Sequence, residues 1–298
     1  MAAAVRLERV LVTGAAGMLG SQLQRTVPAG TRSFGSDLRD GPGVDAAGID
    51  LADESSVARL FAEHGRFDGV LHSAAFTAVD LAEEREADAL RANGEACRVL
   101  ARACAEHGVR LVVLSTDFVF DGRGTRPYRE DDAVSPLSAY GRTKLAGERA
   151  ALDEHPRGTS IVRTQWLYGP RGKHFPGTIL GLAKDKKELK VVHDQVGSPT
   201  STLELAPALW DVLARGEPGI YHAACEGRAS WFDFAVATLE QMRVTGVHVA
   251  PCTTAEFPRP AVRPAYSVLD CTKLARLRGK PLAPWRAALN DFLALTSS

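Results

Sequence analysis

Short runs of aliphatic and β-branched residues alternate with longer stretches of helical periodicity over the first half of the chain. The apolar runs predict buried strands at residues 9–13, 31–35, 68–75 and 110–117. The other stretches predict helices at residues 21–26, 54–63, 84–107 and 137–148. Strands and helices that alternate in this order are typical of a doubly wound α/β fold, in which helices cover both faces of a parallel sheet.

The alternation loosens after about residue 162, where loops, aromatic side chains and isolated polar groups become more frequent. The second half predicts a strand at 219–222 and helices at 203–215, after Ser230 and at 285–295. We therefore expect a first domain over residues 1–165 and a smaller C-terminal domain over residues 166–298. Later strands near residues 190 and 220 are candidates to rejoin the first sheet.

The charge, the length of the apolar runs and the cysteine content argue against several classes of protein. The 36 acidic residues balance the 36 lysines and arginines, so no net charge gathers nucleic acid or an acidic membrane. No apolar run has the length that a membrane span needs. The five cysteines form no C-x-x-C pair, which argues for reduced thiols and against a disulfide framework or a zinc site. We expect a soluble, cytoplasmic protein without a nucleic acid, membrane or metal partner.

Three glycines join the first predicted strand to the following helix. Gly14, Gly17 and Gly20 let the pyrophosphate of a dinucleotide approach the backbone, and the helix start, with Met18 and Leu19, supplies N–H groups and a positive dipole end. This order of strand, glycine turn and helix predicts a Rossmann dinucleotide-binding domain. A structural turn with spare glycines is the alternative.

The choice between NADH and NADPH is open. Asp37 lies about twenty residues after the glycine turn, where a carboxylate accepts hydrogen bonds from the adenosine ribose and favours NADH. Arg32 and Arg39 flank it, and either could pair with the 2′-phosphate of NADPH.

Small and hydroxyl side chains follow two of the predicted strands. Ala74 and Ala75 leave room for a cofactor at the carboxyl edge of a sheet, and the next residues, including Thr77, enter the cleft. Ser115 and Thr116 end a central strand, where a hydroxyl can bind a substrate carbonyl. Capping of the strand is the alternative interpretation.

Tyr140 and Lys144 lie one helical turn apart, on the same face of the helix predicted after Pro136. An ammonium held one turn away lowers the pKa of a phenol and makes it a usable general acid. The alternative is an exposed tyrosine and lysine that share a face by accident.

Seven segments over nearly the whole chain together resemble the dTDP-4-dehydrorhamnose reductase family, in the extended branch of the short-chain dehydrogenase/reductase superfamily. They are Gly14-x-x-Gly17-x-x-Gly20, Ala74-Ala75-x-Thr77-Ala78-Val79-Asp80, Ser115-Thr116-Asp117-x-Val119-Phe120-Asp121-Gly122, Tyr140-Gly141-x-Thr143-Lys144-Leu145-Ala146-Gly147-Glu148, Arg163-Thr164-x-Trp166-x-Tyr168-Gly169, Asp194-Gln195-x-Gly197-x-Pro199-Thr200, and Arg263-Pro264 with Leu269-Asp270. The resemblance implies an oxidoreductase that uses NADPH or NADH. It would reduce the C4 ketone of dTDP-4-dehydro-6-deoxy-L-mannose to give dTDP-L-rhamnose, with a C-terminal domain that binds the dTDP-sugar.

The resemblance also assigns roles. Tyr140 would protonate the C4 alkoxide, Lys144 would hold the cofactor ribose and depress the pKa of Tyr140, and Thr116 would orient the carbonyl. The expected cofactor contacts are Gly14, Gly17, Met18, Leu19, Gly20, Asp37, Arg39, Asp50, Leu51, Ala74, Ala75, Thr77, Asn93, Ser115, Tyr140 and Lys144. The expected substrate contacts are Val79, Thr116, Asp117, Trp166, Gln195 and Arg263.

Four positions depart from the family pattern and leave the sugar open. Met18 and Phe118 stand where glutamine and tyrosine are usual, and Gln165 and His193 replace smaller residues beside the expected sugar pocket. Another dTDP-4-keto-deoxyhexose of secondary metabolism is therefore an alternative substrate.

Three further readings stay open. A non-catalytic regulator similar to the β subunit of methionine adenosyltransferase also keeps the Tyr-x-x-x-Lys segment, although the substrate half favours a reductase. A dehydratase would normally carry an Asp-Glu pair after Thr116, where this chain has Asp117 and Phe118, and the sequence does not decide about an epimerase. A homodimer is a further expectation.

Overall fold

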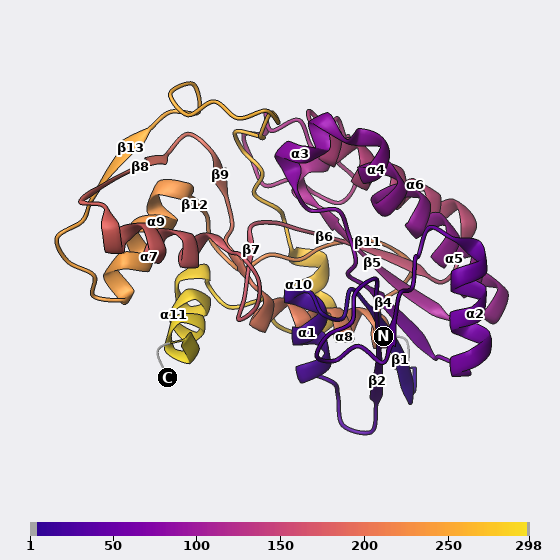
Figure 1. The fold of residues 1–298 in the computed structure, drawn as a ribbon. Coiled ribbons are helices and arrows are strands. Elements are labelled where there is room, and N and C mark those ends of the chain that lie inside the picture. The colour runs from indigo at the N-terminus through magenta and orange to yellow at the C-terminus, as the bar shows by residue number, and fades with distance from the viewer. Residues whose placement is uncertain (1–4, 297–298) are drawn as a thin grey trace.

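Seven strands form the central sheet of the computed structural model, which describes residues 5–296 (Figure 1). The strands are β1 (Arg9–Thr13), β2 (Arg32–Asp37), β3 (Ala46–Ala47), β4 (Gly69–His72), β5 (Arg110–Thr116), β6 (Thr159–Thr164) and β11 (Gly219–His222). Their order is β11-β6-β5-β4-β1-β2-β3, and every neighbouring pair is parallel. This confirms the doubly wound α/β fold. In such a sheet ligands bind where the strand order reverses, here between β1 and β4.

Helices cover both faces of the sheet. Val10 and Val12 of β1 belong to one hydrophobic cluster, while Leu11 between them belongs to another, because successive side chains of a strand point to opposite faces. Helices α1 (Met18–Arg25) and α8 (Thr202–Arg215) cover the first face, with α10 (Thr272–Arg278) against α8. Helices α2 (Glu54–His64), α5 (Ala96–His107) and α6 (Ala139–Glu154) cover the second. Burial on both faces explains the continuous apolar runs in the sequence.

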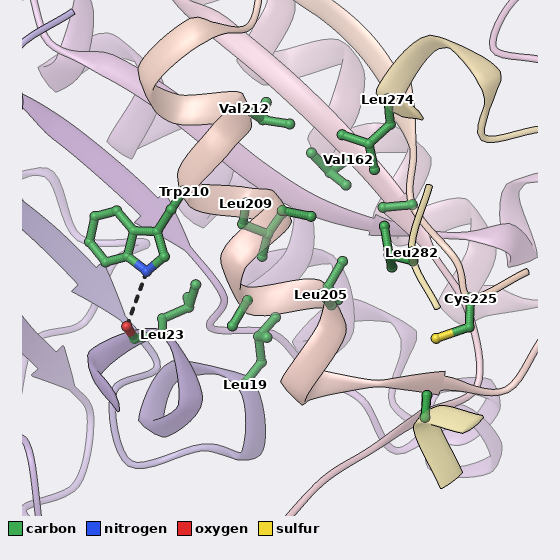
Figure 2. Close-up of a cluster of buried hydrophobic side chains, with 14 of the residues drawn as sticks. Leu19, Leu23, Val162, Leu205, Leu209, Trp210, Val212, Cys225, Leu274 and Leu282 are labelled. Atoms are coloured by element: carbon green, nitrogen blue, oxygen red, sulfur yellow. Dashed lines mark hydrogen bonds between the residues drawn. The ribbon is translucent and has the colours of Figure 1, made fainter. Parts of the chain in front are cut away.

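Helix α8 fixes α1 in place (Figure 2). Leu205 and Leu209 of α8 lie in one cluster with Leu19 of α1, and the Trp210 indole donates to the carbonyl of Leu23 at 3.1 Å. Full burial of a leucine side chain stabilises a fold by about 1.5–3 kcal/mol. Because α1 begins at the glycine turn, this contact from late in the chain also positions that turn.

A smaller body packs beside the carboxyl edge of the sheet (Figure 1). Its elements are β7 (Leu167–Tyr168), α7 (Phe175–Asp185), β8 (Glu188–Val192), β9 (Val196–Gly197), β10 (Thr200–Ser201), β12 (Ala229–Ser230), α9 (Trp231–Gln241), β13 (His248–Cys252) and α11 (Trp285–Thr296). The strand near residue 220 lies in the main sheet as β11, but the strand near 190, β8, does not, because it pairs with β13. The division between residues 165 and 166 stays a prediction.

The helix expected at residues 84–107 is confirmed from Glu86 to His107, but it is broken at Arg85 and contains a π-helical segment. The chain forms α3 (Val79–Glu84), α4 (Glu86–Leu90), a π-helical segment at Arg91–Glu95 and then α5. Leu90 of α4 is 46% exposed, whereas Leu100 of α5 is buried. A π-helical turn inserts one extra residue, so it rotates the apolar stripe around the helix axis.

Three boundaries also differ from the prediction. Helix α1 begins at Met18 rather than at residue 21, because Gly17 is extended and serves as its N-cap. Strand β2 continues to Asp37, and β4 ends at His72, so Ala74 and Ala75 lie beyond the strand.

The structure also bears on the cysteines and on membrane insertion. All five cysteines are free thiols, and Cys271 is the least buried of them. Within residues 5–296, no helix combines the length and apolarity needed to cross a membrane.

Candidate active site

Helix α6 brings Tyr140 to the carboxyl end of β5. The Ser138 hydroxyl caps the helix by accepting from the amide of Gly141 at 3.2 Å. A Cβ on Gly141 would lie 2.3 Å from the carbonyl oxygen of Phe118, so only glycine lets the helix approach the loop after β5 this closely. The approach brings the Tyr140 phenol within hydrogen-bonding reach of Thr116, the last residue of β5.

The surroundings of Tyr140 keep its phenol protonated. The ring is partly buried and meets Phe118 edge-on, with centroids 5.5 Å apart. The pKa of Tyr140 is raised to about 12, chiefly by burial and then by the Asp117 carboxylate, against the opposing hydrogen bond with Thr116. The expectation that Lys144 lowers this pKa is wrong for this arrangement. Lys144 instead donates from Nζ to a backbone carbonyl.

Lys144 is buried behind Tyr140, and its acceptor is the carbonyl of Leu114 at 2.6 Å. Burial lowers the pKa of Lys144, while Cys97 and Glu148 oppose that change. The hydrogen bond to Leu114 therefore holds the Lys144 ammonium, which extends from α6, against β5.

A buried ion pair stands next to Lys144. Glu148 of α6 and Arg163 of β6 are 2.7 Å apart between Oε2 and Nη2, and each side chain is 3% exposed. The Ser115 hydroxyl donates to the same carboxylate. Removal of one partner from a buried pair typically costs about 3–5 kcal/mol. Ser115, an expected cofactor contact, thus directs its hydroxyl at this ion pair.

Asp117 and Gln165 follow directly after Thr116 and Thr164, which are paired at the ends of β5 and β6. Ser267, from a late loop, donates to Gln165 Oε1 at 3.2 Å and also bonds to Asp117. Burial raises the pKa of Asp117 to about 6, against the hydrogen bonds from Ser267 and Thr116. The sequence marked Gln165 only as a departure from a family pattern, and it offered no signal for Ser267 beyond its place in that loop.

The glycine turn has the close packing that a dinucleotide site requires. Gly14 has a φ of 67°, and a Cβ there would lie 2.7 Å from the amide nitrogen of Ala74. A Cβ on Gly20 would lie 2.0 Å from the carbonyl oxygen of Gly14. No side chain caps α1 at Gly17, so its first-turn amides and positive dipole end face the turn. These residues fit the pyrophosphate of a dinucleotide.

Asp37 and Asp50, the expected contacts to the ribose and the adenine, have different hydrogen-bond partners. The Asp37 carboxylate accepts from the amides of Ala16 and Arg39, each at 3.1 Å, which ties β2 to the glycine turn. Asp50 instead accepts two hydrogen bonds from Arg91, at 3.0 and 2.8 Å, and these lower the pKa of Asp50. The Arg39 side chain is exposed, whereas the Asp50 carboxylate is engaged by an arginine of the π-helical segment.

The remaining expected cofactor contacts surround this turn. Ala75 and Thr77 are exposed in the segment after β4, Leu51 is buried, and Met18 is the first residue of α1. The backbone of Ala74 lies against Gly14. All of them remain predicted contacts.

Asn93 connects two parts of the site rather than presenting a free amide. It is buried in the π-helical segment, a feature often found at functional sites. Its Oδ1 accepts from the Phe76 amide at 2.9 Å, and its Nδ2 donates to the Phe76 carbonyl and the Thr143 hydroxyl at 3.2 and 3.1 Å. Asn93 therefore joins the segment after β4 to the turn of α6 between Tyr140 and Lys144.

Trp166 and Gln195 belong to one connected group. Trp166 has a positive φ of 49°, which is strained for a bulky residue, and its ring stacks on Trp231 at 3.6 Å. Gln195 accepts from the Trp231 indole at 3.1 Å and donates to the Thr254 hydroxyl at 3.0 Å. The amide of Gln195 thus holds the tryptophan stack that supports Trp166.

Arg263 spans the two bodies. Its two terminal nitrogens donate to the Asp80 carboxylate of α3, each at 3.0 Å. Burial raises the pKa of Asp80, but the hydrogen bonds from Arg263 and Ala261 outweigh it and hold that pKa below its usual value. Val79, the expected neighbour of the sugar, precedes Asp80 and is partly buried. The Arg263 guanidinium is therefore engaged by α3.

A cavity of about 580 Å³ lies in the smaller body. Its lining includes His193, Arg228, Phe232 and Tyr266, and Tyr266 directly precedes Ser267, which contacts Asp117. The segment that contains Tyr266 and Ser267 thus runs from the cavity toward the end of β5, and the cavity volume falls within the range of small-molecule pockets. Over residues 5–296, no group of three or more histidine, cysteine or acidic side chains could hold a metal ion.

Comparison with known proteins gives consistent matches. The model of the family described as RmlD substrate binding domain matches residues 8–297. A dTDP-4-dehydrorhamnose reductase of Streptomyces griseus is 43% identical over 291 residues, 95% of this chain and 92% of the relative. A probable dTDP-4,6-dihydroxy-2-methyloxan-3-one 4-ketoreductase of Streptomyces antibioticus is 42% identical, over 95% of this chain and 94% of the relative.

Solved structures agree with these matches over nearly full length. A dTDP-4-dehydrorhamnose reductase from Clostridium acetobutylicum superposes with a TM-score of 0.90 at 39% identity, covering 97% of this chain and 100% of the other. A dTDP-4-dehydrorhamnose reductase from Bacillus anthracis, in complex with NADP, has the same TM-score and coverage at 34% identity.

Proposed function

The chain belongs to the RmlD substrate binding domain family, and from this membership we propose that it is an NAD(P)H-dependent reductase of a nucleotide-sugar ketone. Its substrate is dTDP-4-dehydro-6-deoxy-L-mannose, and its product is dTDP-L-rhamnose. The convergence of Tyr140, Thr116 and the glycine turn at the carboxyl edge of one sheet carries the proposal. Ketone reduction needs a proton donor and a carbonyl partner beside a bound nicotinamide.

Each of three side chains has a separate task. When bound, the nicotinamide cofactor supplies the hydride. Thr116, whose hydroxyl donates to Asp117 Oδ1 at 3.1 Å in this structure, would turn to donate to the C4 carbonyl oxygen and orient it, and the Tyr140 phenol gives its proton to that oxygen. An alkoxide is a stronger base than a phenolate, so a neutral phenol with a raised pKa is still an effective donor. Lys144 would hold the ribose hydroxyls of the cofactor.

NADPH is the cofactor that this arrangement favours. The Asp37 carboxylate already accepts from two backbone amides, and the exposed Arg39 follows it closely, where a guanidinium can pair with a 2′-phosphate. The structure of the Bacillus anthracis relative with NADP supports the same choice.

The cavity beside Tyr266 is the place we assign to the dTDP portion of the substrate. Arg228 offers a guanidinium for a phosphate, and Phe232 and Tyr266 offer ring faces. Val79 and Trp166 would flank the sugar between this cavity and Tyr140. We also propose a cytoplasmic location, in keeping with the free thiols, and a homodimer.

The direct test is oxidation of NADPH, and separately NADH, with freshly made dTDP-4-dehydro-6-deoxy-L-mannose, followed by identification of the sugar formed. We expect dTDP-L-rhamnose as the product. In Tyr140→Phe, we expect kcat to fall by about 10²- to 10⁴-fold, because the proton donor is lost. Cofactor binding and the melting temperature should be nearly unchanged.

Tyr221→Phe is the matched control, because this tyrosine donates to the carbonyl of Glu217, which precedes the amino end of β11, whereas the site lies at the carboxyl edge of the sheet. Its turnover should equal that of the unaltered protein. Near-normal turnover in Tyr140→Phe would remove Tyr140 from the acid role. If the protein binds NADPH or NADH but no dTDP-4-ketosugar causes the cofactor to be oxidised, the result would favour the hypothesis of a non-catalytic regulator.

A second candidate function is reduction of a different dTDP-4-keto-deoxyhexose. The Streptomyces antibioticus relative, named as a probable 4-ketoreductase of such a sugar, is nearly as similar as the Streptomyces griseus reductase. Oxidation of NADPH with that sugar, but not with dTDP-4-dehydro-6-deoxy-L-mannose, would establish it.

A further inference from the structure

Two charged side chains of α6 bind successive residues of β5. Lys144 donates from Nζ to the carbonyl of Leu114 at 2.6 Å. Glu148, one helical turn later, accepts from the hydroxyl of Ser115. The next residue of β5 is Thr116, the expected partner of the substrate carbonyl. A cation and an anion on one face of α6 therefore hold the end of β5 that leads into the site.

Arg163 of β6 fixes the direction of the Glu148 carboxylate. Its Nε donates to Oε1 at 2.9 Å and its Nη2 donates to Oε2 at 2.7 Å, so the contact is bidentate. Arg163 is also the register partner of Ser115 in the parallel pair of β5 and β6. The side chains of Glu148 and Arg163 are each 3% exposed. Two residues of neighbouring strands thus hold a buried carboxylate one helical turn from Lys144.

Three titratable side chains from different elements act on Lys144. They are His72 of β4, Cys97 of α5 and Glu148 of α6. Burial, and then Lys144 itself, lowers the pKa of His72 to about 3, whereas burial raises the pKa of Cys97 to about 11. Both groups are therefore neutral at pH 7. Of the three, only Glu148 carries a charge there that offsets the ammonium.

We propose that Glu148, held in place by Arg163, is the positioning residue that keeps Lys144 charged toward the cofactor ribose. This inference rests on the proposed role of Lys144 at that ribose. Burial lowers the pKa of Lys144, and the carboxylate opposes that change. An ammonium has three donors, of which Leu114 takes one, so two remain for the two hydroxyls of a ribose. Loss of the proton removes one donor and the charge, and so weakens cofactor binding.

A purely structural ion pair makes a different prediction. In that role Glu148 and Arg163 are equivalent, because removal of either one leaves the other charge buried and unpaired. In the positioning role they differ. Removal of Glu148 lowers the pH at which Lys144 loses its proton, whereas removal of Arg163 leaves the carboxylate beside the ammonium.

The test measures the dissociation constant of NADPH by fluorescence titration between about pH 7 and 10.5, a range in which Tyr140, with its pKa raised to about 12, stays protonated. In the unaltered protein this constant should rise at alkaline pH, and Lys144→Met should remove the rise. In Glu148→Gln the midpoint of the rise should move down by about 1 pH unit or more, because a nearby opposite charge shifts a pKa by about that amount. In Arg163→Met the midpoint should not move down.

A double variant keeps the test decisive if Glu148→Gln fails to fold. Glu148→Gln combined with Arg163→Met leaves no unpaired charge buried, so we expect it to fold and to show the same downward shift. Glu154→Gln is the matched control. Glu154 lies later on α6 and also forms an ion pair, with Arg102 at 2.8 Å, but nearer the surface. Its loss should leave the midpoint unchanged.

Two results would overturn the inference. One is an unaltered midpoint in folded Glu148→Gln or in the double variant, and the other is an equal downward shift in Glu148→Gln and Arg163→Met. An NADPH affinity of the unaltered protein that does not vary with pH would remove Lys144 from the ribose, and this inference with it. The titration contains no sugar. A protein that shows the expected shifts but reduces no dTDP-4-ketosugar would therefore lose the proposed reaction and keep this inference.

Discussion

At the scale of single residues, Asp117 and Tyr140 change their protonation states in different pH ranges. Burial raises the pKa of Asp117 to about 6, so its carboxylate is mainly ionised above that pH. Tyr140, with its pKa raised to about 12, stays protonated through the neutral and mildly alkaline range. If Asp117 binds a hydroxyl of the substrate, as the family resemblance implies, that hydroxyl can donate to it only weakly once the carboxyl group is protonated.

We therefore predict that kcat/KM falls at acidic pH and does not fall again in the neutral range. Between about pH 4.5 and 8, kcat/KM should rise through about pH 6 and then stay level, because kcat/KM reports the pKa values of the free enzyme. Steady-state NADPH oxidation at saturating cofactor measures it. Asp117→Asn should lower the plateau and remove the lower limb. A limb that persists unchanged in this variant would assign it to another group.

The Tyr-x-x-x-Lys spacing predicted which residue would be the general acid, but it did not predict the pKa of that residue. Helical periodicity places Tyr140 and Lys144 on one face, and the structure has them there in α6. The acceptor of Lys144, the carbonyl of Leu114, comes from a strand thirty positions away in the sequence. Burial and Asp117 then decide the pKa of Tyr140, and neither can be read from the spacing.

At the scale of elements, the glycine turn depends on close contact between α1, β1 and β4. A Cβ on Gly20 would lie 2.0 Å from the carbonyl oxygen of Gly14, and backbone cannot yield at that distance. We predict that Gly20→Ala weakens NADPH binding at least about tenfold and lowers the melting temperature. Fluorescence titration with NADPH and thermal unfolding measure the two effects.

Gly181 of α7 is the control for this substitution. It is also helical, but a Cβ there meets nothing within 4 Å. Alanine is favoured over glycine in a helix by about 0.5–1 kcal/mol, so Gly181→Ala should leave binding unchanged and raise stability slightly. Equal effects of the two variants would contradict the close-contact explanation.

Helices and strands were predicted correctly where a local hydrophobic pattern specifies them. The prediction failed where an inserted residue shifts the helical periodicity. The apolar runs correctly located β1 and β5, since strands buried on both faces are apolar throughout. The π-helical segment at Arg91–Glu95 could not be foreseen, because Asn93 bonds there to Phe76 and Thr143, which lie far from it in the sequence.

At the scale of the molecule, the Arg263–Asp80 pair joins the late loop to α3 over 183 positions of sequence. Its geometry is bidentate and its side chains are 19% and 28% exposed. We predict a coupling free energy of about 1 kcal/mol between Arg263→Met and Asp80→Asn in a double-mutant cycle of urea unfolding. Each single variant should also raise KM for the dTDP-sugar several-fold.

The pair Arg126–Asp132 serves as the control cycle, because it is also bidentate but lies within one exposed loop. Its coupling should be smaller and its variants should leave KM unchanged. Strict additivity of Arg263→Met and Asp80→Asn would show that the contact does not join the two bodies.

The sequence by itself determined the fold class, and it also predicted the reacting groups. Alternating apolar runs and helical stretches, the glycine turn and the Tyr140–Lys144 spacing are local patterns, and local patterns specify strands, turns and helix faces directly. That is why the doubly wound sheet is confirmed and why Tyr140 and Thr116 meet as expected.

Only the tertiary structure decided which of the expected polar contacts are already paired within the protein. Ser115, Gln195 and Arg263 were plausible contacts from sequence, but each is engaged by a partner at least 33 positions away. The amide oxygen of Gln165 is likewise held by Ser267, 102 positions later in the sequence. Hydrogen-bond pairing in a buried site depends on groups that the fold brings together, and spacing along the chain carries no record of it.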